Sequence, residues 1–201
     1  MKVVEIKKYG GPDVLYIGNR EVPKPKLNEV LIKVKAAGIN RPDILQREGG
    51  YPPPKDASDV LGLEIAGEIV ELGKNAKKFK KGNKVCALVS GGGYAEYCIA
   101  PQTQCLSIPK NMSFEEAATI PETFFTIWFN LFIKNQIKKN QKILIHGGSS
   151  GIGTTAIQFA KNYGLKVFTT VRNDSKKEKC KKLGAHYPIN VKKINFEKFV
   201  K

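Results

Sequence analysis

The sequence predicts a chain in two parts: a β-rich part at residues 1–120 and an α/β part with a parallel sheet at residues 121–201. In the first part, Gly, Pro and Asn separate short apolar or alternating runs, which is typical of a barrel-like β unit. From residue 142 the order strand, Gly-rich turn, helix, strand, helix, strand indicates a parallel sheet. At 201 residues, the chain is long enough to bury a core.

The elements of the first part follow from short local patterns. Strands are expected at residues 3–6, 29–39, 63–73, 84–89 and 94–100. The run 41–49, with Pro42 near its start, predicts one or two helical turns. Ser113 and Glu116 form a Ser-x-x-Glu capping box, which predicts that a helix begins there.

The second part opens with a run of apolar residues. Residues 121–135 carry apolar side chains on nearly every face, so we expect a largely buried helix with Trp128 in the core. Ser175 and Glu178 form a second capping box, and Gly184 marks the end of the helix that follows. Strands are expected at residues 142–145, 166–171 and 186–191.

Charge and composition narrow the classes of function. The net charge is +16, and residues 121–201 hold 16 basic and 4 acidic groups. Because these lysines are scattered rather than striped with aromatic residues, we interpret most of them as a solvated surface. Weak nucleic-acid binding, and RNA binding in particular, stays open as an alternative.

Cysteine spacing and hydrophobicity give further expectations. The cysteines at 86, 98, 105 and 180 form no C-x-x-C pair and lie far from both histidines in sequence, so we expect free buried thiols and no metal site. No stretch approaches the roughly 18 apolar residues of a spanning helix. The N-terminus shows no apolar signal core, so we expect a cytoplasmic protein that does not associate with membranes.

The turn "HGGSSGIG" at residues 146–153 carries the strongest functional signal. Gly148, Gly151 and Gly153 form a G-x-x-G-x-G pattern, and glycine permits close approach of the backbone to a pyrophosphate. The helix N-terminus behind the turn supplies N–H groups and a positive dipole end, and Ser149 and Ser150 add hydroxyl groups. The strand before the turn and the helix after it indicate a dinucleotide site.

The end of the second strand of the α/β part favours NADPH over NADH. Enzymes that use NAD usually carry Asp or Glu at this point, on the ribose 2′-OH. Here "TTVRND" places Arg172 there, and Lys176 follows at the start of the next helix. Both cations suit a 2′-phosphate. Asp174 comes slightly later, where capping of the helix is its simplest role.

Several stretches together resemble the zinc-independent, zeta-crystallin-like quinone oxidoreductases of the medium-chain dehydrogenase/reductase superfamily. They are residues 39–54, 61–73, 91–101, 115–128 and 143–161. The resemblance covers essentially the whole chain. It implies a GroES-like domain at residues 1–120 and the N-terminal half of a Rossmann NADP-binding domain at residues 121–201. In zinc-bearing relatives, the segment that corresponds to residues 62–64 carries a ligand His. Leu63 at that position implies that no metal is bound.

The resemblance also implies an activity and site residues. The activity is the reduction of quinones, or alternatively of α,β-unsaturated carbonyl compounds, by hydride transfer from NADPH. Asn40 would face the nicotinamide and the substrate, Tyr51 would line the acceptor pocket, and Thr126 would bond near the carboxamide. The residues implied at the pyrophosphate and the 2′-phosphate are Ser150, Gly151, Ile152, Gly153, Arg172 and Lys176.

These roles have plainer alternatives. Asn40 would cap a turn, Tyr51 would pack its own loop, and Thr126 would bond its own helix backbone. Catalysis in the implied enzyme would come mainly from positioning and from exclusion of water. Water or Tyr51 would supply the proton, and the sequence shows no dedicated acid–base pair.

The chain ends after three of the six strands of a doubly wound sheet, so the resemblance implies a C-terminally truncated member of the family. We therefore expect uncovered apolar surface, and the missing half argues against the family-type homodimer. The chain alone is expected to bind NADPH weakly and to turn over poorly. An inactive remnant or interaction subunit is the remaining alternative.

Overall fold

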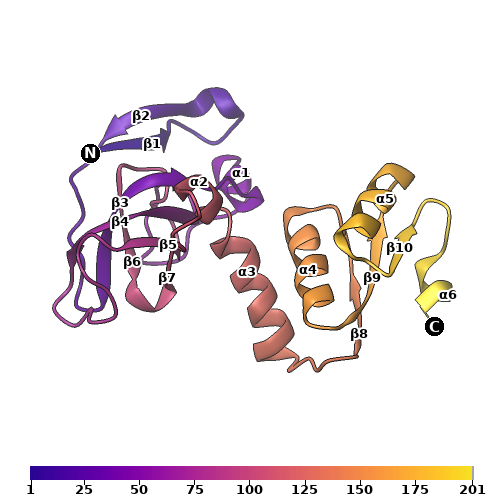
Figure 1. The fold of residues 1–201 in the computed structure, drawn as a ribbon. Helices are drawn as coiled ribbons and strands as arrows, with labels where there is room; N and C mark the ends of the chain where they lie inside the picture. The colour runs from indigo at the N-terminus through magenta and orange to yellow at the C-terminus, as the bar shows by residue number, and fades with distance from the viewer. Residues whose placement is uncertain (201) are drawn as a thin grey trace. The chain divides into compact units, whose positions relative to one another are not determined.

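The computed structural model describes residues 1–200 and divides the chain into two compact units, Met1–Glu122 and Thr123–Lys201 (Figure 1). The first unit contains strands β1 to β7 and helices α1 and α2. The second contains β8 to β10 and α4 to α6. Helix α3 (Pro121–Trp128) includes the division between the units.

The core of the first unit is an antiparallel sheet of five strands, in the order β6-β3-β4-β5-β7. Ile32 on β3, Ile65 and Ile69 on β4 and Val85 on β5 are fully buried in it. An added Cβ at Gly67 would lie 2.2 Å from the Lys33 carbonyl oxygen, so β3 and β4 can approach this closely only with glycine there. The strands are β3 (Glu29–Ala37), β4 (Glu64–Leu72), β5 (Lys84–Leu88), β6 (Tyr97–Pro101) and β7 (Cys105–Ser107).

The helices of the first unit are short. Helix α1 (Arg41–Arg47) and helix α2 (Phe114–Ala117) both begin with a capping arrangement. At α2, the Ser113 hydroxyl accepts the Glu116 N–H, and the Glu116 carboxylate accepts the Ser113 N–H. The capping box predicted from the sequence is therefore confirmed. Two 3-10 turns, at Pro12–Val14 and Gln102–Gln104, complete the local structure.

A two-stranded antiparallel ribbon precedes this sheet. It consists of β1 (Lys2–Ile6) and β2 (Leu15–Asn19). The Val4 N–H donates to the Tyr94 carbonyl oxygen at 2.8 Å, and Val3 forms an isolated bridge with Ala95. Val3 is only 1% exposed, so the ribbon also contributes to the buried interior.

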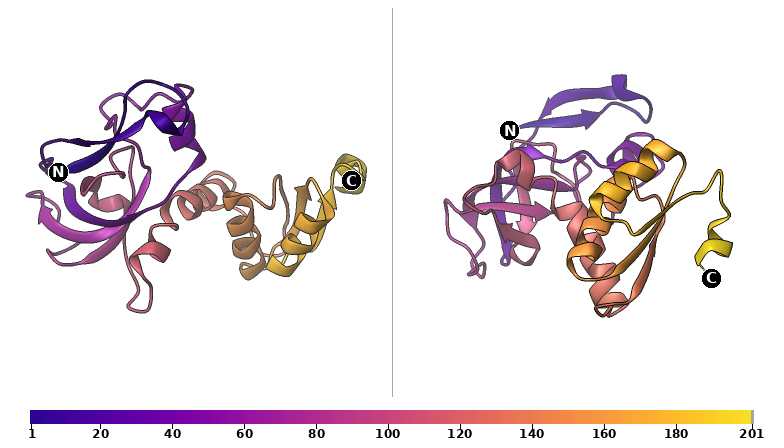
Figure 2. Two further views of the ribbon diagram at one scale, coloured as in Figure 1. Left: turned by 90° about the horizontal axis from the view of Figure 1, so that it is seen from above. Right: turned by 45° about the vertical axis from the view of Figure 1, so that its right-hand side comes forward.

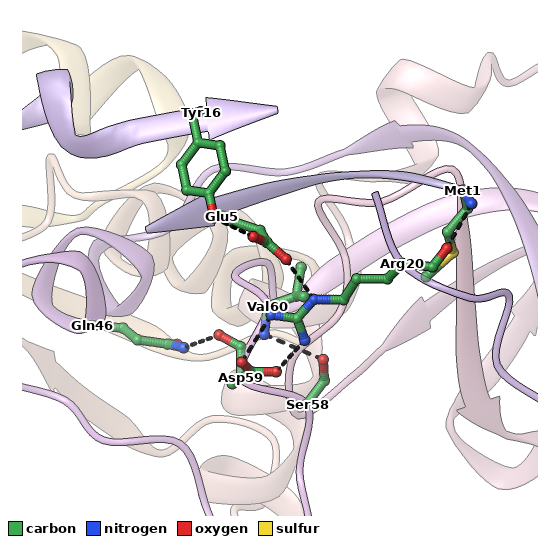
Figure 3. A network of polar contacts seen from close by, with 8 residues as sticks. All are labelled: Met1, Glu5, Tyr16, Arg20, Gln46, Ser58, Asp59 and Val60. Atoms are coloured by element: carbon green, nitrogen blue, oxygen red, sulfur yellow. Dashed lines mark hydrogen bonds and ion pairs between the residues drawn. The ribbon is translucent and has the colours of Figure 1, made fainter. Parts of the chain in front are cut away.

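Arg20, directly after the ribbon, joins it to the loop before β4 (Figure 3). Its Nε donates to Glu5 at 2.6 Å, and its two terminal nitrogens donate to the Asp59 carboxylate at 2.6 and 2.9 Å. Tyr16 also donates its hydroxyl proton to Glu5. These hydrogen bonds lower the pKa of Glu5, chiefly through Tyr16 and then Arg20, and Arg20 lowers the pKa of Asp59.

The second unit is a three-stranded parallel sheet in the order β10-β9-β8. Helices α4 and α5 pack against one another and against the sheet (Figure 2). The predicted alternation of strands and helices is therefore confirmed. The elements are β8 (Lys142–Ile145), α4 (Gly151–Asn162), β9 (Lys166–Val171), α5 (Asp174–Leu183), β10 (Tyr187–Asn190) and α6 (Phe196–Val200).

The expectation of a largely buried helix at residues 121–135 is wrong. The α-helix ends at Trp128, and a π-helical turn continues to Lys134. Trp128 is 51% exposed and Ile133 is 59% exposed. Trp128 is therefore not a core residue. It stacks on Phe132, with ring centroids 4.6 Å apart, and Phe132 in turn contacts Phe159 on α4.

The predicted cap of helix α5 is also wrong. The helix begins at Asp174, and the Asn173 Oδ1 accepts the Lys176 N–H at 2.9 Å, so Asn173 rather than Ser175 is the cap. Asp174 accepts hydrogen bonds from the Asn190 amide and the Lys193 ammonium instead. The predicted end at Gly184 is confirmed, with a φ of 117° that favours glycine.

Two further expectations concern cysteines and membranes. All four cysteines are buried and free, as predicted. Burial raises the pKa of the thiols of Cys98 and Cys105 to about 12, so both stay protonated at neutral pH. Within residues 1–200, no helix combines the length and hydrophobicity needed to span a membrane.

Candidate functional site

The Gly-rich turn of the second unit lies against strand β9. The Gly148 N–H donates to the Thr170 carbonyl oxygen at 3.0 Å, and the Gly147 N–H donates to the Thr170 hydroxyl at 3.2 Å. An added Cβ at Gly148 would lie 2.1 Å from the Thr169 Oγ1. Close packing against β9 therefore explains why Gly148 is glycine.

The N-terminus of helix α4 follows directly from this turn. Ser150 is the N-cap residue, and its hydroxyl accepts the Gly153 N–H at 3.0 Å. An added Cβ at Gly153 would lie 2.4 Å from the Gly147 carbonyl oxygen. At Gly151, by contrast, the nearest atom in the described chain would be 3.9 Å away. Packing does not require glycine at Gly151, and the missing side chain leaves room beside the helix N-terminus.

A pocket of about 400 Å³ lies at this helix N-terminus. The structure brings Ser149, Ser150, Arg172 and Lys176 together in the lining of this pocket. Among the described residues, no salt bridge involves Arg172 or Lys176, so both cations are available to an anion. The lining residues are Gly147, Ser149, Ser150, Thr170, Val171, Arg172, Lys176 and Val191.

Not every residue predicted for this site lines the pocket. Gly153 is buried beneath the turn, and Ile152 is 38% exposed on the first turn of α4. Sequence reasoning missed Thr170 and Val191, which the sheet places beside the turn. The Thr170 hydroxyl lies 3.2 Å from His146 Nδ1. Only the pairing of β8 with β9 reveals this position, because Thr170 carries no motif of its own.

In the first unit, Tyr51 lies at a smaller pocket of about 190 Å³. The lining is mostly apolar, and its titratable side chains are Tyr51 and Glu122. Tyr51 also borders a neighbouring pocket of about 460 Å³ that includes Tyr9 and Arg20. The lining residues of the smaller pocket are Pro42, Gln46, Tyr51, Pro53, Pro54, Leu63, Leu88, Val89, Ser90, Gln104 and Glu122.

Asn40 is held by a buried carboxylate beside this pocket. Its side-chain amide donates to Glu64 Oε1 at 2.8 Å, and the other Glu64 oxygen accepts the Glu122 N–H at 2.9 Å. Glu64 is 3% exposed. An added Cβ at Gly38 would lie 2.1 Å from Glu64 Oε1, so glycine at this position makes room for the carboxylate.

A second buried carboxylate belongs to the same cluster. Asp43 is 3% exposed; its Oδ2 accepts the Tyr94 hydroxyl and the Asn40 N–H, both at 2.7 Å, whereas its Oδ1 has no hydrogen-bond partner. Burial raises the pKa of Glu64, and the negative charge of Asp43 adds to this effect. Burial and the bond to Asp43 also raise the pKa of Tyr94.

Thr126 lies in the second unit, whereas Asn40 and Tyr51 lie in the first. Thr126 is half-buried on α3, and its carbonyl oxygen accepts a hydrogen bond from the Asn130 side chain at 2.8 Å. Its assignment to the cofactor rests on the resemblance. In the described residues, no group of three or more His, Cys, Asp or Glu side chains is arranged to hold a metal ion.

Comparison with known proteins gives relatives for both units. Residues 26–110 match the alcohol dehydrogenase GroES-like domain, and residues 151–201 match the zinc-binding dehydrogenase family. The human quinone oxidoreductase is 34% identical over 198 residues, which cover 98% of this chain and 60% of that protein. The chain thus spans about 60% of the length of the curated relatives it matches.

Solved structures agree with this result. The Escherichia coli quinone oxidoreductase complexed with NADPH is 32% identical, with a TM-score of 0.84 over 98% of this chain and 60% of that one. The CurK enoyl reductase is 30% identical, with a TM-score of 0.84 over 94% of this chain and 59% of that one.

A GroES-like unit followed by an α/β unit with a Gly-rich turn at a helix N-terminus defines a chain of the dehydrogenase/reductase class. Within that class, this chain resembles the zeta-crystallin-like quinone oxidoreductases of the medium-chain dehydrogenase/reductase superfamily, and the similarity extends over 98% of the chain. The fold and the resemblance predicted from the sequence are thereby confirmed.

Proposed function

We propose that this chain serves the zinc-independent reduction of quinones by NADPH. The observation that carries the proposal is the pocket at the N-terminus of α4, where two cations and two serines meet the Gly-rich turn. Such a set of donors suits the phosphates of a dinucleotide. The NADPH complex of the Escherichia coli relative supports the same cofactor for this chain.

The residues present fit this cofactor. The first-turn N–H groups of α4 and the serine hydroxyls would hold the pyrophosphate, because N–H groups at a helix N-terminus lack intrahelical partners. Arg172 and Lys176 would hold the 2′-phosphate, and Thr126 the carboxamide. When bound, NADPH supplies the hydride from its nicotinamide ring. The open side of Gly151 leaves the space that close approach to the phosphates needs.

In the first unit, the pocket at Tyr51 would hold the acceptor. A mostly apolar lining suits a flat ring and excludes water, and the Tyr51 hydroxyl would donate a hydrogen bond to a carbonyl oxygen. Asn40 would face the reacting atoms with its orientation set by Glu64. Positioning in such a pocket is the main contribution that a quinone requires from the protein.

A second candidate acceptor is an α,β-unsaturated carbonyl compound. The similarity to the CurK enoyl reductase favours it. Both acceptors offer a carbonyl oxygen to Tyr51 and receive hydride on carbon or oxygen of a conjugated system. The rates of NADPH oxidation by the purified chain with each acceptor distinguish the two candidates.

The test is the rate of NADPH oxidation by the purified chain with 1,4-benzoquinone and, separately, with 2-cyclohexenone. We expect turnover with the quinone, and a KM that rises about fivefold in Tyr51→Phe because one hydrogen bond is lost. Tyr97→Phe, on β6 and away from this pocket, is the control and should match the wild type. Rates no higher than those without protein, for both acceptors, would contradict the proposal.

A further inference from the structure

The pocket at Tyr51 contains a carboxyl group, Glu122, that sequence reasoning assigned no role. Reduction of a quinone or an enone consumes a proton as well as a hydride. A proton donor at the pocket would supply that proton. The two titratable side chains in the lining are Tyr51 and Glu122. Tyr51 is 42% exposed, whereas Glu122 is half-buried.

The position of Glu122 is set by the first turn of α3. Pro121 before it is buried and begins the helix, where proline is well tolerated. The Glu122 N–H donates to Glu64 Oε2 at 2.9 Å, which ties this residue to β4. Glu122 therefore lines the pocket from a helix start that a buried carboxylate anchors.

The surroundings of Glu122 favour its protonated form. Burial, followed by the negative charges of Glu64 and Asp43, raises the pKa of Glu122 above its ordinary value of 4.5. In the described chain, no salt bridge involves any of these three carboxyl groups. The other titratable groups of this cluster are Tyr94, which donates to Asp43, and the Cys86 thiol on β5, whose pKa is raised mainly by burial and also by the charge of Glu64.

We propose that Glu122 is a catalytic acid, whose carboxyl group gives its proton to the oxygen of the reduced acceptor held beside Tyr51. This inference rests on the proposed reduction. A quinone that accepts a hydride becomes the anion of its hydroquinone. The anionic oxygen forms an O–H bond as the Glu122 O–H bond breaks, and water then returns a proton to the Glu122 carboxylate. One quinone, one NADPH and one proton yield one hydroquinone and one NADP⁺.

The variant that tests this inference is Glu122→Gln, which keeps the size of the side chain and removes its acidic proton. We expect kcat with benzoquinone to fall about 10- to 100-fold, in line with the loss of a general acid. The wild-type kcat should decrease as pH rises through the pKa of Glu122, and this limb should be absent in the variant. Its NADPH affinity and its unfolding midpoint should equal those of the wild type. The matched control is Glu71→Gln, an exposed residue of β4.

A second readout does not depend on turnover. The infrared difference between the ligand-free wild type and Glu122→Gln, followed as pH rises, should keep the band of a protonated carboxyl group to a higher pH than an ordinary glutamate would. A difference that shows only carboxylate bands would overturn the inference, as would an unchanged kcat and pH profile in an active Glu122→Gln enzyme. A wild-type chain that oxidises no NADPH with either acceptor would instead contradict the proposed function on which the inference rests.

Discussion

Gly148 and Gly151 lie in the same turn, but the described structure requires glycine only at Gly148. An added Cβ at Gly148 would overlap the Thr169 hydroxyl, which itself donates to the Ile145 carbonyl oxygen at 2.7 Å. At Gly151 the space is open. The two glycines therefore have different roles. Gly148 lets the turn pack on the sheet, and Gly151 keeps the helix N-terminus accessible.

Gly148→Ala should destabilise the second unit by about 1–3 kcal/mol, because the added methyl group must push Thr169 away from its buried hydrogen bond. Urea unfolding measures the change. Gly151→Ala is the control, and it should preserve the unfolding free energy while weakening NADPH binding. A Gly148→Ala protein as stable as the wild type would contradict this interpretation of the turn.

Arg20 makes stability depend on pH in the acid range. The pKa values of Glu5 and Asp59 are lowered in the folded chain, so their ion pairs contribute stability above the ordinary carboxyl values of 4.5 and 3.8. This contribution is lost as pH falls through the lowered values. Arg20→Met should therefore be less stable than the wild type at neutral pH, and the difference should vanish in strong acid.

Thermal unfolding of both proteins across this pH range measures the effect. Lys55→Met, an exposed cation outside the salt bridges of the described residues, is the control and should follow the wild-type curve. A difference between Arg20→Met and the wild type that stays constant down to strong acid would show that Arg20 acts through packing rather than charge.

The residues of the two pockets differ in how far the sequence predicts them. Ser149 and Ser150 belong to a local motif, so their neighbourhood follows from the order of residues alone. The contact between Glu64 and Glu122 joins residues 58 positions apart. No local pattern contains it, because it depends on how β4 and the start of α3 meet in the folded unit.

At the scale of elements, helix α5 shows that a capping motif in the sequence does not always mark the residue that caps the helix. Ser175 and Glu178 match the capping pattern, but Asn173, with an extended backbone (φ −158°, ψ 166°), is the residue whose side chain reaches the Lys176 N–H. Asparagine is as good a cap as serine, so the earlier candidate in the sequence begins the helix.

Asn173→Ala should cost about 0.5–2 kcal/mol of unfolding free energy, since it leaves the Lys176 N–H without its side-chain partner. Chemical unfolding provides the measurement. Ser175→Ala, on the first turn of the same helix, should be close to neutral. If Ser175→Ala were the more costly change, the cap would lie where the sequence motif placed it.

The sequence also predicted too much burial for helix α3 and did not predict the short strands β2 and β7. Apolar residues on every face predict burial, yet Trp128 is 51% exposed, and the aromatic rings of α3 and the π-helical turn pack on Phe159 and Tyr163 along one flank. Strand β2 was missed because its sequence, "LYIGN", is short and contains glycine. Strand β7 was missed because it is only three residues long.

At the scale of the whole molecule, the sequence predicts both units because each has its own spacing of apolar residues and buries its own core. Apolar clusters on β3, β4 and β5 form one core, and clusters on α4, β8 and β9 form another. The net charge is +16, residues 121–201 hold 16 basic and 4 acidic groups, and two of the basic groups, Arg172 and Lys176, line the pocket at the N-terminus of α4. A positive field of this kind favours an anionic ligand such as a dinucleotide phosphate.

The most direct test of this account is a fluorescence titration of the 201-residue chain with NADPH and, in parallel, with NADH. We predict tighter binding of NADPH. Arg172→Ala should weaken NADPH binding about tenfold or more by removing charge-assisted bonds to the 2′-phosphate, and should leave NADH binding unchanged. Lys179→Ala, on an exposed part of α5, should behave as the wild type. Equal affinity for the two nucleotides, or an equal loss of both in Arg172→Ala, would contradict the assignment of this pocket.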